Sequence, residues 1–133
     1  MTYSYLITPF FSWFVTGVLK FLINSIKSRR FAFSLIGYGG MPSNHSAIVS
    51  SMTMLVFLKE GVSSPAFGVA LTLSFIVLLD ANSLRKQIEK HAVSLNTLCD
   101  FKLRERIGHS KAEIGVGCVV GCAVATALHM AGV

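Results

Sequence analysis

The sequence predicts an all-α integral membrane protein with about four transmembrane helices, an interfacial amphipathic helix and a re-entrant or interfacial connector. Of its 133 residues, 53% are hydrophobic and 14% are charged, whereas charged residues make up about 25% of an average soluble domain. The hydrophobic residues gather in blocks long enough to cross a bilayer. One other segment instead alternates polar and apolar residues at helical spacing. We expect residues 1–133 to form a single membrane-embedded domain.

The first predicted span covers residues 5–26, which are rich in Phe and Leu. Lys20 interrupts this span. An ionisable residue at that depth indicates a functional role, although a lysine stem that reaches the membrane surface would also explain it. Residues 31–38 are too short to span and end at two glycines, so we interpret them as the re-entrant or interfacial connector.

The second and third predicted spans cover residues 45–58 and 66–79, and a turn with Pro65 joins them. Residues 82–98 change character. Their apolar residues, among them Leu84 and Ile88, share one helix face and charged residues lie elsewhere, which predicts a helix on the membrane surface.

A charged connector over residues 100–111 leads to the last predicted span, residues 114–133. Gly117 and Gly121 have the four-residue spacing that allows a close helix–helix contact. This face of small residues predicts a partner, and we expect a homodimer.

Basic residues are distributed unevenly over the predicted loops. The segments after the first span and between the third and fourth spans share one side of the membrane and carry Lys27, Arg29, Arg30, Arg85, Lys86, Lys90, Lys102, Arg104, Arg106 and Lys111. The turn between the second and third spans offers only Lys59. The positive-inside rule therefore places the first group in the cytoplasm and both termini outside.

The formal charge of +6 has the same explanation. Basic residues that crowd beside apolar segments are typical of contact with anionic lipid headgroups, so we expect no nucleic-acid partner. The three cysteines show neither a disulfide framework nor a metal-binding spacing. We therefore expect no metal and no other cofactor.

The most informative stretch is Gly39-Gly40-Met41-Pro42-Ser43-Asn44-His45-Ser46-Ala47. The glycines allow the backbone to bend, and the proline stops any helix that arrives from the N-terminal side. Ser43 or Asn44 can then cap a helix that starts directly afterwards. The unpaired N–H groups of a helix start bind anions. His45 in the first turn adds a proton donor, which is the chemistry of phosphate ester cleavage.

This stretch resembles the signature of the type 2 phosphatidic acid phosphatase and vanadium haloperoxidase superfamily, and more closely that of its divergent bacterial and plant branch. The resemblance continues in order through the C-terminal half of the chain, with Asp80-Ala81 through Arg85, Leu95-Asn96, Ile107-Gly108-His109, Glu113, and Gly117 to Gly121. An ordered set of this kind is more specific than one motif.

The resemblance implies a covalent mechanism that needs no metal. One histidine attacks phosphorus, a carboxylate orients it, and a second histidine protonates the leaving alkoxide. His45 would be the leaving-group acid, with Ser43 and Ser46 near the phosphate. Arg85 and Lys20 would bind the phosphoryl oxygens. The superfamily's first motif, Lys, six residues, Arg-Pro, is incomplete, because Lys27 and Ser28 stand where Arg-Pro is expected.

Two histidines compete for the role of nucleophile. Arg85 and His91 fit the spacing of the superfamily's third motif, but Leu95 stands where its carboxylate is expected. His109 has Glu113 four residues later, on the same face of a helix, where a carboxylate would fix the imidazole tautomer. We therefore predict that His109 is the nucleophile and Glu113 its orienting carboxylate, with His91 as the alternative.

Asp80 and Asn96 complete the candidate substrate-binding residues, and Asp80 has a second interpretation as a salt-bridge partner of Arg85. The resemblance thus implies a lipid-phosphate phosphatase, and the distribution of basic residues places its site at the cytoplasmic face of a bacterial inner membrane. Its partners would be the bilayer and a phosphorylated membrane lipid, and phosphatidylglycerophosphate is the candidate lipid. The alternatives are a non-catalytic lipid-binding or assembly protein with the same fold, and a vanadate-dependent haloperoxidase.

Overall fold

The structure is a computed structural model that describes residues 3–28 and 40–133. Within these ranges the chain forms five α-helices and no β-strand. The helices are α1 (Ser4–Ser28), α2 (Asn44–Glu60), α3 (Pro65–Asn82), α4 (Leu84–Leu98) and α5 (Lys111–Met130). The all-helical prediction is confirmed for these residues. The connector predicted over residues 31–38 lies outside them.

Serine side chains define where three of the helices begin. Ser43 precedes α2 and accepts a hydrogen bond from the backbone N–H of Ser46, as a helix cap does. Ser64 caps α3 in the same way, and Pro65 takes the first helical position, where it needs no N–H donor. Ser110 begins α5 as part of a capping box.

Three helical stretches are long and apolar enough to cross a membrane: Ser4–Lys27, Pro65–Leu98 and Lys111–Met130. With 17 residues, α2 is about 25 Å long at 1.5 Å per residue. That is shorter than the roughly 30 Å hydrocarbon core of a typical bilayer. Three of the four predicted spans in the described residues are therefore long enough to cross a membrane. The fourth, α2, is too short to do so as a straight helix.

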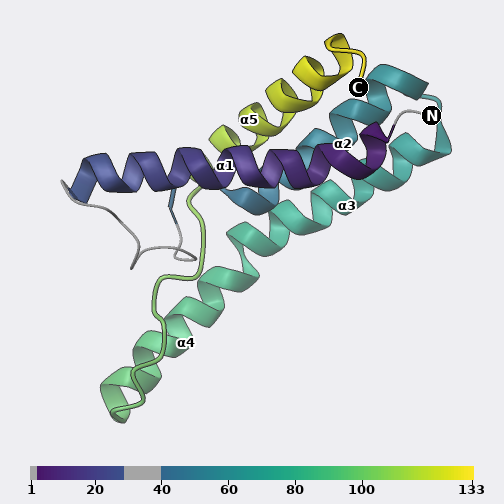
Figure 1. Cartoon of the computed structure of the whole chain (residues 1–133). Coiled ribbons are helices and arrows are strands. Elements are labelled where there is room, and N and C mark those ends of the chain that lie inside the picture. Colours follow the sequence, from purple (N-terminus) through teal and green to yellow (C-terminus); the bar gives the residue numbers. More distant parts are fainter. Residues whose placement is uncertain (1–2, 29–39) are drawn as a thin grey trace.

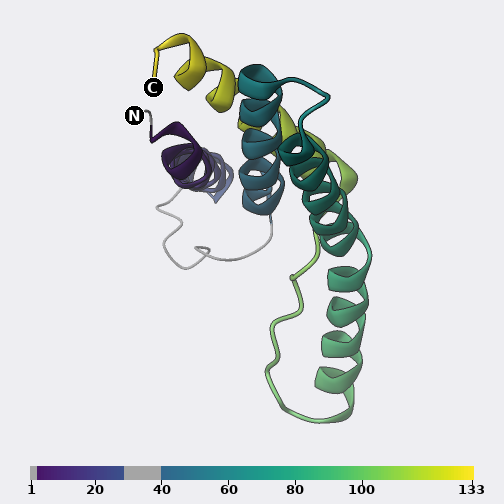
Figure 2. The same ribbon diagram turned by 90° about the vertical axis from the view of Figure 1, so that its right-hand side faces the viewer.

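Helix α2 is the centre of the bundle and packs against α1, α3 and α5 (Figures 1 and 2). Its buried residues are mostly small: Ser46, Ala47, Ser50, Ser51, Leu55 and Val56. Small side chains allow neighbouring helices to approach closely, which is the usual way for helices to pack in a membrane.

The small-residue face of α5 packs against α2. A Cβ atom at Gly117 would lie 2.5 Å from the carbonyl oxygen of Ser43, and one at Gly121 would overlap the carbonyl oxygen of Ala47. The predicted close helix contact therefore exists, but within one chain. This face is therefore occupied by α2 within the chain, and the homodimer stays a prediction.

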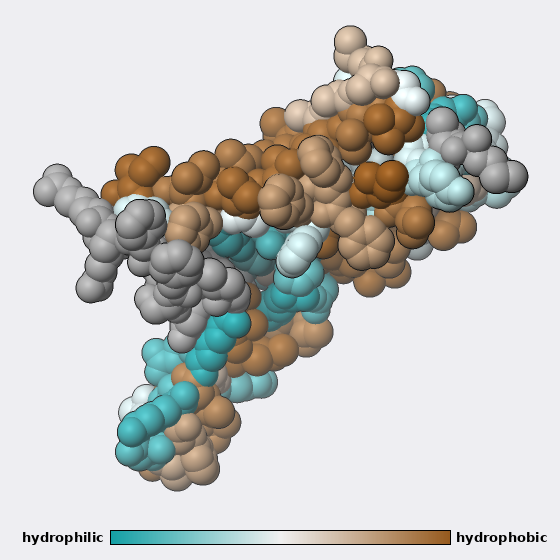
Figure 3. Space-filling view, viewed as in Figure 1, coloured by the Kyte–Doolittle hydropathy of each residue, from teal (hydrophilic) through white to brown (hydrophobic). Residues whose placement is uncertain are grey.

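Helix α1 is polar inside and apolar outside. Ser4, Thr8, Ser12 and Thr16 recur every four residues and are fully buried. The Ser12 hydroxyl donates a hydrogen bond to the carbonyl oxygen of Ala47 on α2, at 3.1 Å. The outer face exposes large apolar side chains, which form the brown band along α1 in Figure 3. This arrangement suits a helix surrounded by lipid.

Both chain ends lie at the same end of the bundle (Figure 1). There the Lys59 ammonium group donates to the Ser4 hydroxyl at 2.6 Å and to the carbonyl oxygen of Val133 at 3.4 Å. At the opposite end α4 follows α3 after one residue, Ser83, and leads away from the other helices (Figure 2).

Residues 99–110 return along α4 to the bundle without regular structure. The Asn96 side chain holds the two segments together, because its amide donates to the Leu103 carbonyl oxygen and its oxygen accepts from the Leu103 N–H, each at 2.8 Å. The return path brings residues 107–110 to the bundle end remote from the termini.

Candidate active site

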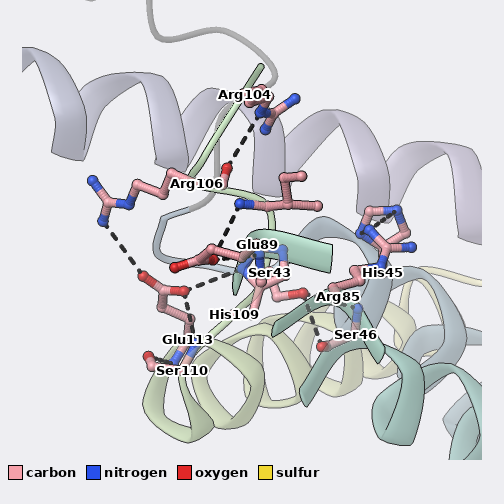
Figure 4. A network of polar contacts seen from close by, with 12 residues as sticks. Ser43, His45, Ser46, Arg85, Glu89, Arg104, Arg106, His109, Ser110 and Glu113 are labelled. Atoms are coloured by element: carbon pink, nitrogen blue, oxygen red, sulfur yellow. Dashed lines mark hydrogen bonds and ion pairs between the residues drawn. The ribbon is translucent and has the colours of Figure 1, made fainter. Parts of the chain in front are cut away.

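Three segments that are distant in sequence meet at the bundle end remote from the termini. The first turn of α2 carries His45, the first turn of α4 carries Arg85, and the residues before α5 carry His109 (Figure 4). In the space-filling view, hydrophilic side chains gather between α1 and the α4 segment (Figure 3).

Backbone hydrogen bonds join these segments. The Ser43 N–H donates to the Glu113 carbonyl oxygen at 3.0 Å, which attaches the start of α2 to the start of α5. The His109 N–H donates to the carbonyl oxygen of Ala81 at 3.2 Å, which attaches the return segment to the end of α3. The relative positions of the site residues therefore depend on main-chain contacts as well as on side-chain packing.

Arg85 lies between a carboxylate and an imidazole. Its Nε is 2.7 Å from Asp80 Oδ2, and its Nη1 is 3.3 Å from His45 Nε2. The salt bridge to Asp80 fixes the plane of the guanidinium group beside His45. A planar guanidinium with remaining N–H donors is well suited to bind phosphoryl oxygens.

His45 and His109 face each other across the site. Their ring centroids are 6.3 Å apart and the rings are tilted by 56°. A general acid and a nucleophile must both reach the same phosphoryl group, and this short distance brings the two imidazoles into one site.

His109 is held by Glu113. The His109 Nδ1 and Glu113 Oε2 atoms are 3.1 Å apart. The same carboxylate oxygen accepts from the Ser110 N–H, and the Ser110 hydroxyl accepts from the Glu113 N–H. This capping box fixes the carboxylate, and the carboxylate in turn favours the tautomer with the proton on Nδ1, which leaves the Nε2 lone pair for attack.

The surroundings of His109 favour its neutral form. Burial lowers the pKa of His109 below its ordinary value, the hydrogen bond that His109 donates to Glu113 opposes this, and the charges of Lys20 and Arg85 lower it further. A neutral imidazole is the form that can attack phosphorus.

Lys20 on α1 belongs to the same cluster. It is half-buried, and it lies close enough to His45, His109 and Glu113 for its charge to act on each of them. The functional interpretation of Lys20 stays a prediction.

Ser43 and Ser46, which flank His45 in sequence at the start of α2, are fully buried. The Ser46 hydroxyl donates to the Ser43 hydroxyl at 3.0 Å, and the Ser46 N–H also donates to it. Their interactions stabilise the start of α2. The N–H groups of Asn44 and His45 belong to the first turn, where helix geometry supplies no acceptor.

His91 and Asn96 are not brought into this cluster. His91 is exposed on α4, beyond Arg85 on the part of the helix that leads away from the bundle. The Asn96 amide is used by the return segment, where it also donates to Glu105 Oε1 at 2.8 Å. The structure thus separates the two competing histidines, because only the return of residues 99–110 brings His109 to the bundle.

Two contacts of the site were not expected from the sequence. Arg106 Nη2 lies 4.0 Å from Glu113 Oε1, and Glu89 Oε2 accepts hydrogen bonds from the backbone N–H groups of Ile107 and Gly108. Arg106 and Glu89 lie in no recognisable motif. Glu89 belongs to an amphipathic helix, on which a charged side chain usually faces water. In residues 3–28 and 40–133, no group of three or more His, Cys, Asp or Glu side chains is placed to hold a metal ion.

Comparison with known proteins gives a family. The model of the family described as "Divergent PAP2 family" matches residues 1–124, so the resemblance seen in the motifs is confirmed. The chain is also 32% identical to YuiD, an uncharacterized membrane protein of Bacillus subtilis strain 168, over 78% of this chain and 80% of that protein. No solved structure matches the chain significantly.

Proposed function

We propose that this chain, which belongs to the divergent PAP2 family, is a membrane lipid-phosphate phosphatase that works through a phosphohistidine. The observation that carries the proposal is the 6.3 Å separation of the His45 and His109 rings, with Arg85 beside one ring and Glu113 bonded to the other. The proposed acid, the proposed nucleophile and the proposed phosphate ligand Arg85 thus lie at one site.

In the proposed first step, the Nε2 lone pair of His109 attacks phosphorus. An N–P bond forms and the P–O bond to the lipid alcohol breaks, while His45 gives its proton to the departing oxygen. Arg85 and Lys20 stabilise the charge on the equatorial oxygens, and Glu113 stabilises the positive charge that develops on the His109 ring.

In the second step, water attacks phosphorus and His45 takes a proton from it. The N–P bond breaks and inorganic phosphate leaves, which restores His45 as an acid and His109 as a nucleophile. The cationic side chains supply the electrostatic stabilisation in this scheme, and no step is assigned to a metal.

For the membrane arrangement, we propose four spans with α2 as the fourth, and α4 as the interfacial helix. The exposed leucine and isoleucine side chains of α4 (Leu84, Ile88, Leu95 and Leu98) would enter the bilayer surface. The site lies at the end of the bundle that carries most basic residues, which the positive-inside rule assigns to the cytoplasm. The site would then act on a lipid of the inner leaflet of a bacterial cytoplasmic membrane, with phosphatidylglycerophosphate as the candidate.

The orientation can be tested with the native cysteines. Cys99 is exposed at the end of α4, and Cys118 and Cys122 lie within α5. A membrane-impermeant maleimide should label Cys99 in inverted membrane vesicles and leave it unmodified in intact cells. Labelling in intact cells alone would reverse the orientation and exclude an inner-leaflet substrate.

The activity itself is tested with purified protein in detergent. We expect phosphate release from lipid phosphomonoesters without added metal, unchanged by EDTA, and lost in His45→Ala. A protein that binds such lipids but releases no phosphate from any of them would favour the non-catalytic alternative, which the incomplete Lys, six residues, Arg-Pro motif supports. A requirement for vanadate and peroxide would indicate a haloperoxidase.

A further inference from the structure

We infer that Glu89 on α4 is a positioning residue, which sets the place of His109 by holding the backbone immediately before it. The inference rests on the proposed function and deepens it. Glu89 Oε2 accepts a hydrogen bond from the Gly108 N–H at 3.0 Å and another from the Ile107 N–H at 3.3 Å. Hydrogen bonds to an ionised carboxylate are about twice as strong as neutral ones.

The segment before His109 needs such a contact because it has no regular structure of its own. It also lies flat against α4. A Cβ atom at Gly108 would come within 2.8 Å of Lys86 Cγ and 3.2 Å of the Lys86 backbone nitrogen. The missing side chain of Gly108 thus allows the segment to approach α4 closely, and the hydrogen bonds to the Glu89 carboxylate keep the segment in that position.

The position of Glu89 on α4 gives the contact a functional meaning. Arg85 and Glu89 are four residues apart, so they lie on the same side of the helix, one turn from each other. Arg85 reaches His45 on α2, and Glu89 reaches the backbone next to His109. One rigid helix therefore fixes both the proposed phosphate ligand and the proposed nucleophile, and so sets the distance between them.

The test compares Glu89→Ala, which removes both acceptor oxygens, with Glu89→Gln, which keeps one. Glu105 supplies the matched control, since it lies on the return segment and its carboxylate accepts from Asn96 of α4. All variants are made in the full chain, and phosphate release from detergent-solubilised lipid phosphomonoester is measured.

We expect Glu89→Ala to lower kcat roughly 10²-fold, which is the cost of a misplacement of about 1 Å, with KM changed less than about threefold because the proposed substrate ligands remain. Glu89→Gln should recover most of kcat, and Glu105→Ala should stay within about twofold of the unmodified chain. Equal kcat in Glu89→Ala and the unmodified chain would overturn the inference. A Glu89→Gln variant as impaired as Glu89→Ala would also overturn it, because the role would then not be hydrogen-bond acceptance.

A second readout does not depend on activity. The charged and titratable groups that face His109 come from four elements: Lys20 of α1, His45 of α2, Arg85 of α4 and Glu113 of α5. Burial among them lowers the pKa of His109. The pKa of His109 can be followed by NMR of its imidazole. If Glu89 holds His109 in this buried position, Glu89→Ala should raise that pKa toward the ordinary value of about 6.5. The control Glu105→Ala should leave it unchanged.

This titration distinguishes the two ways of failing. If the unmodified chain releases no phosphate, the proposed function fails, but a pKa shift confined to Glu89→Ala still supports the positioning role. If the chain is active and the pKa of His109 is the same in all variants, the inference about Glu89 fails and the proposed function stands.

Discussion

The imidazole rings of His45 and His109 lie 6.3 Å apart, although one belongs to the start of α2 and the other to the segment before α5. The prediction that follows directly is that each ring has a different role. His45→Ala and His109→Ala should each lower kcat on a lipid phosphate by roughly 10²–10⁴-fold, the usual contribution of such groups. His91→Ala is the matched control and should stay within about twofold, because His91 is exposed away from the site.

The leaving group separates the two roles. An aryl phosphate has a leaving oxygen that needs little protonation, so it should restore the first step, seen as a burst of released aryl alcohol, in His45→Ala and not in His109→Ala. An acid-labile phosphoenzyme should be trapped in His45→Ala and be missing from His109→Ala. Restoration of both variants by the aryl phosphate would contradict the assignment.

A second prediction concerns the salt bridge between Arg85 and Asp80, whose Nε and Oδ2 atoms are 2.7 Å apart. A lysine at position 85 has a single nitrogen, so it cannot contact Asp80 through one nitrogen and present separate nitrogens to a phosphoryl group, as the planar guanidinium can. We expect Arg85→Lys to lower kcat/KM by roughly 10²–10³-fold, as for the loss of one donor to a developing oxyanion. Lys90→Ala, on the exposed side of the same helix, should change kcat/KM less than twofold. A Lys90→Ala effect as large as that of Arg85→Lys would point to long-range charge instead.

The third prediction is the pH dependence. Burial, Lys20 and Arg85 lower the pKa of His109, whereas Glu113 raises it. The neutral, nucleophilic form therefore persists below the ordinary histidine pKa of about 6.5, and the acid limb of kcat/KM should lie below that value. Glu113→Gln removes a charge that raises the pKa of His109, so the acid limb of kcat/KM should move to still lower pH. The value of kcat should fall, because the His109 ring is no longer oriented by a carboxylate. A limb that moves to higher pH in Glu113→Gln is the opposite outcome and would reject Glu113 as the partner of His109.

A fourth prediction tests the contact between α5 and α2. A Cβ at Gly121 would overlap the Ala47 carbonyl oxygen, so Gly121→Ala should lower the free energy of unfolding by about 1–3 kcal/mol, the usual cost of overpacking. Gly115→Ala on the same helix has open space around its Cβ and should be neutral or stabilising by up to about 1 kcal/mol. Urea unfolding in detergent measures both. Equal stability of the two variants would argue against this helix contact.

Much of the local structure could be predicted from the sequence. Four apolar blocks correspond to α1, α2, α3 and α5, and the amphipathic segment to α4, with ends that differ by a few residues. Ser43 is one of the two residues expected to cap α2. Such features depend on neighbours in the chain, so composition, spacing and turn residues reveal them.

The site was predictable only in part. The sequence led to His45, Arg85, His109 and Glu113 through a family resemblance and through the four-residue spacing of the last two. It could not show that Asn96 is used by the return segment or that Glu89 contacts the backbone at Gly108. Both contacts join residues that no local spacing relates.

By itself, then, the sequence determined that this is a helical membrane protein with a serine-capped helix start and several residues suited to phosphate chemistry. The tertiary structure decided which of those residues meet. It brought His109 rather than His91 to His45, and it used the glycine face of α5 within the chain rather than for a partner. The physical reason is that helix formation is governed by local periodicity, whereas the meeting of remote side chains depends on how closely the helices pack and where the connecting segments return.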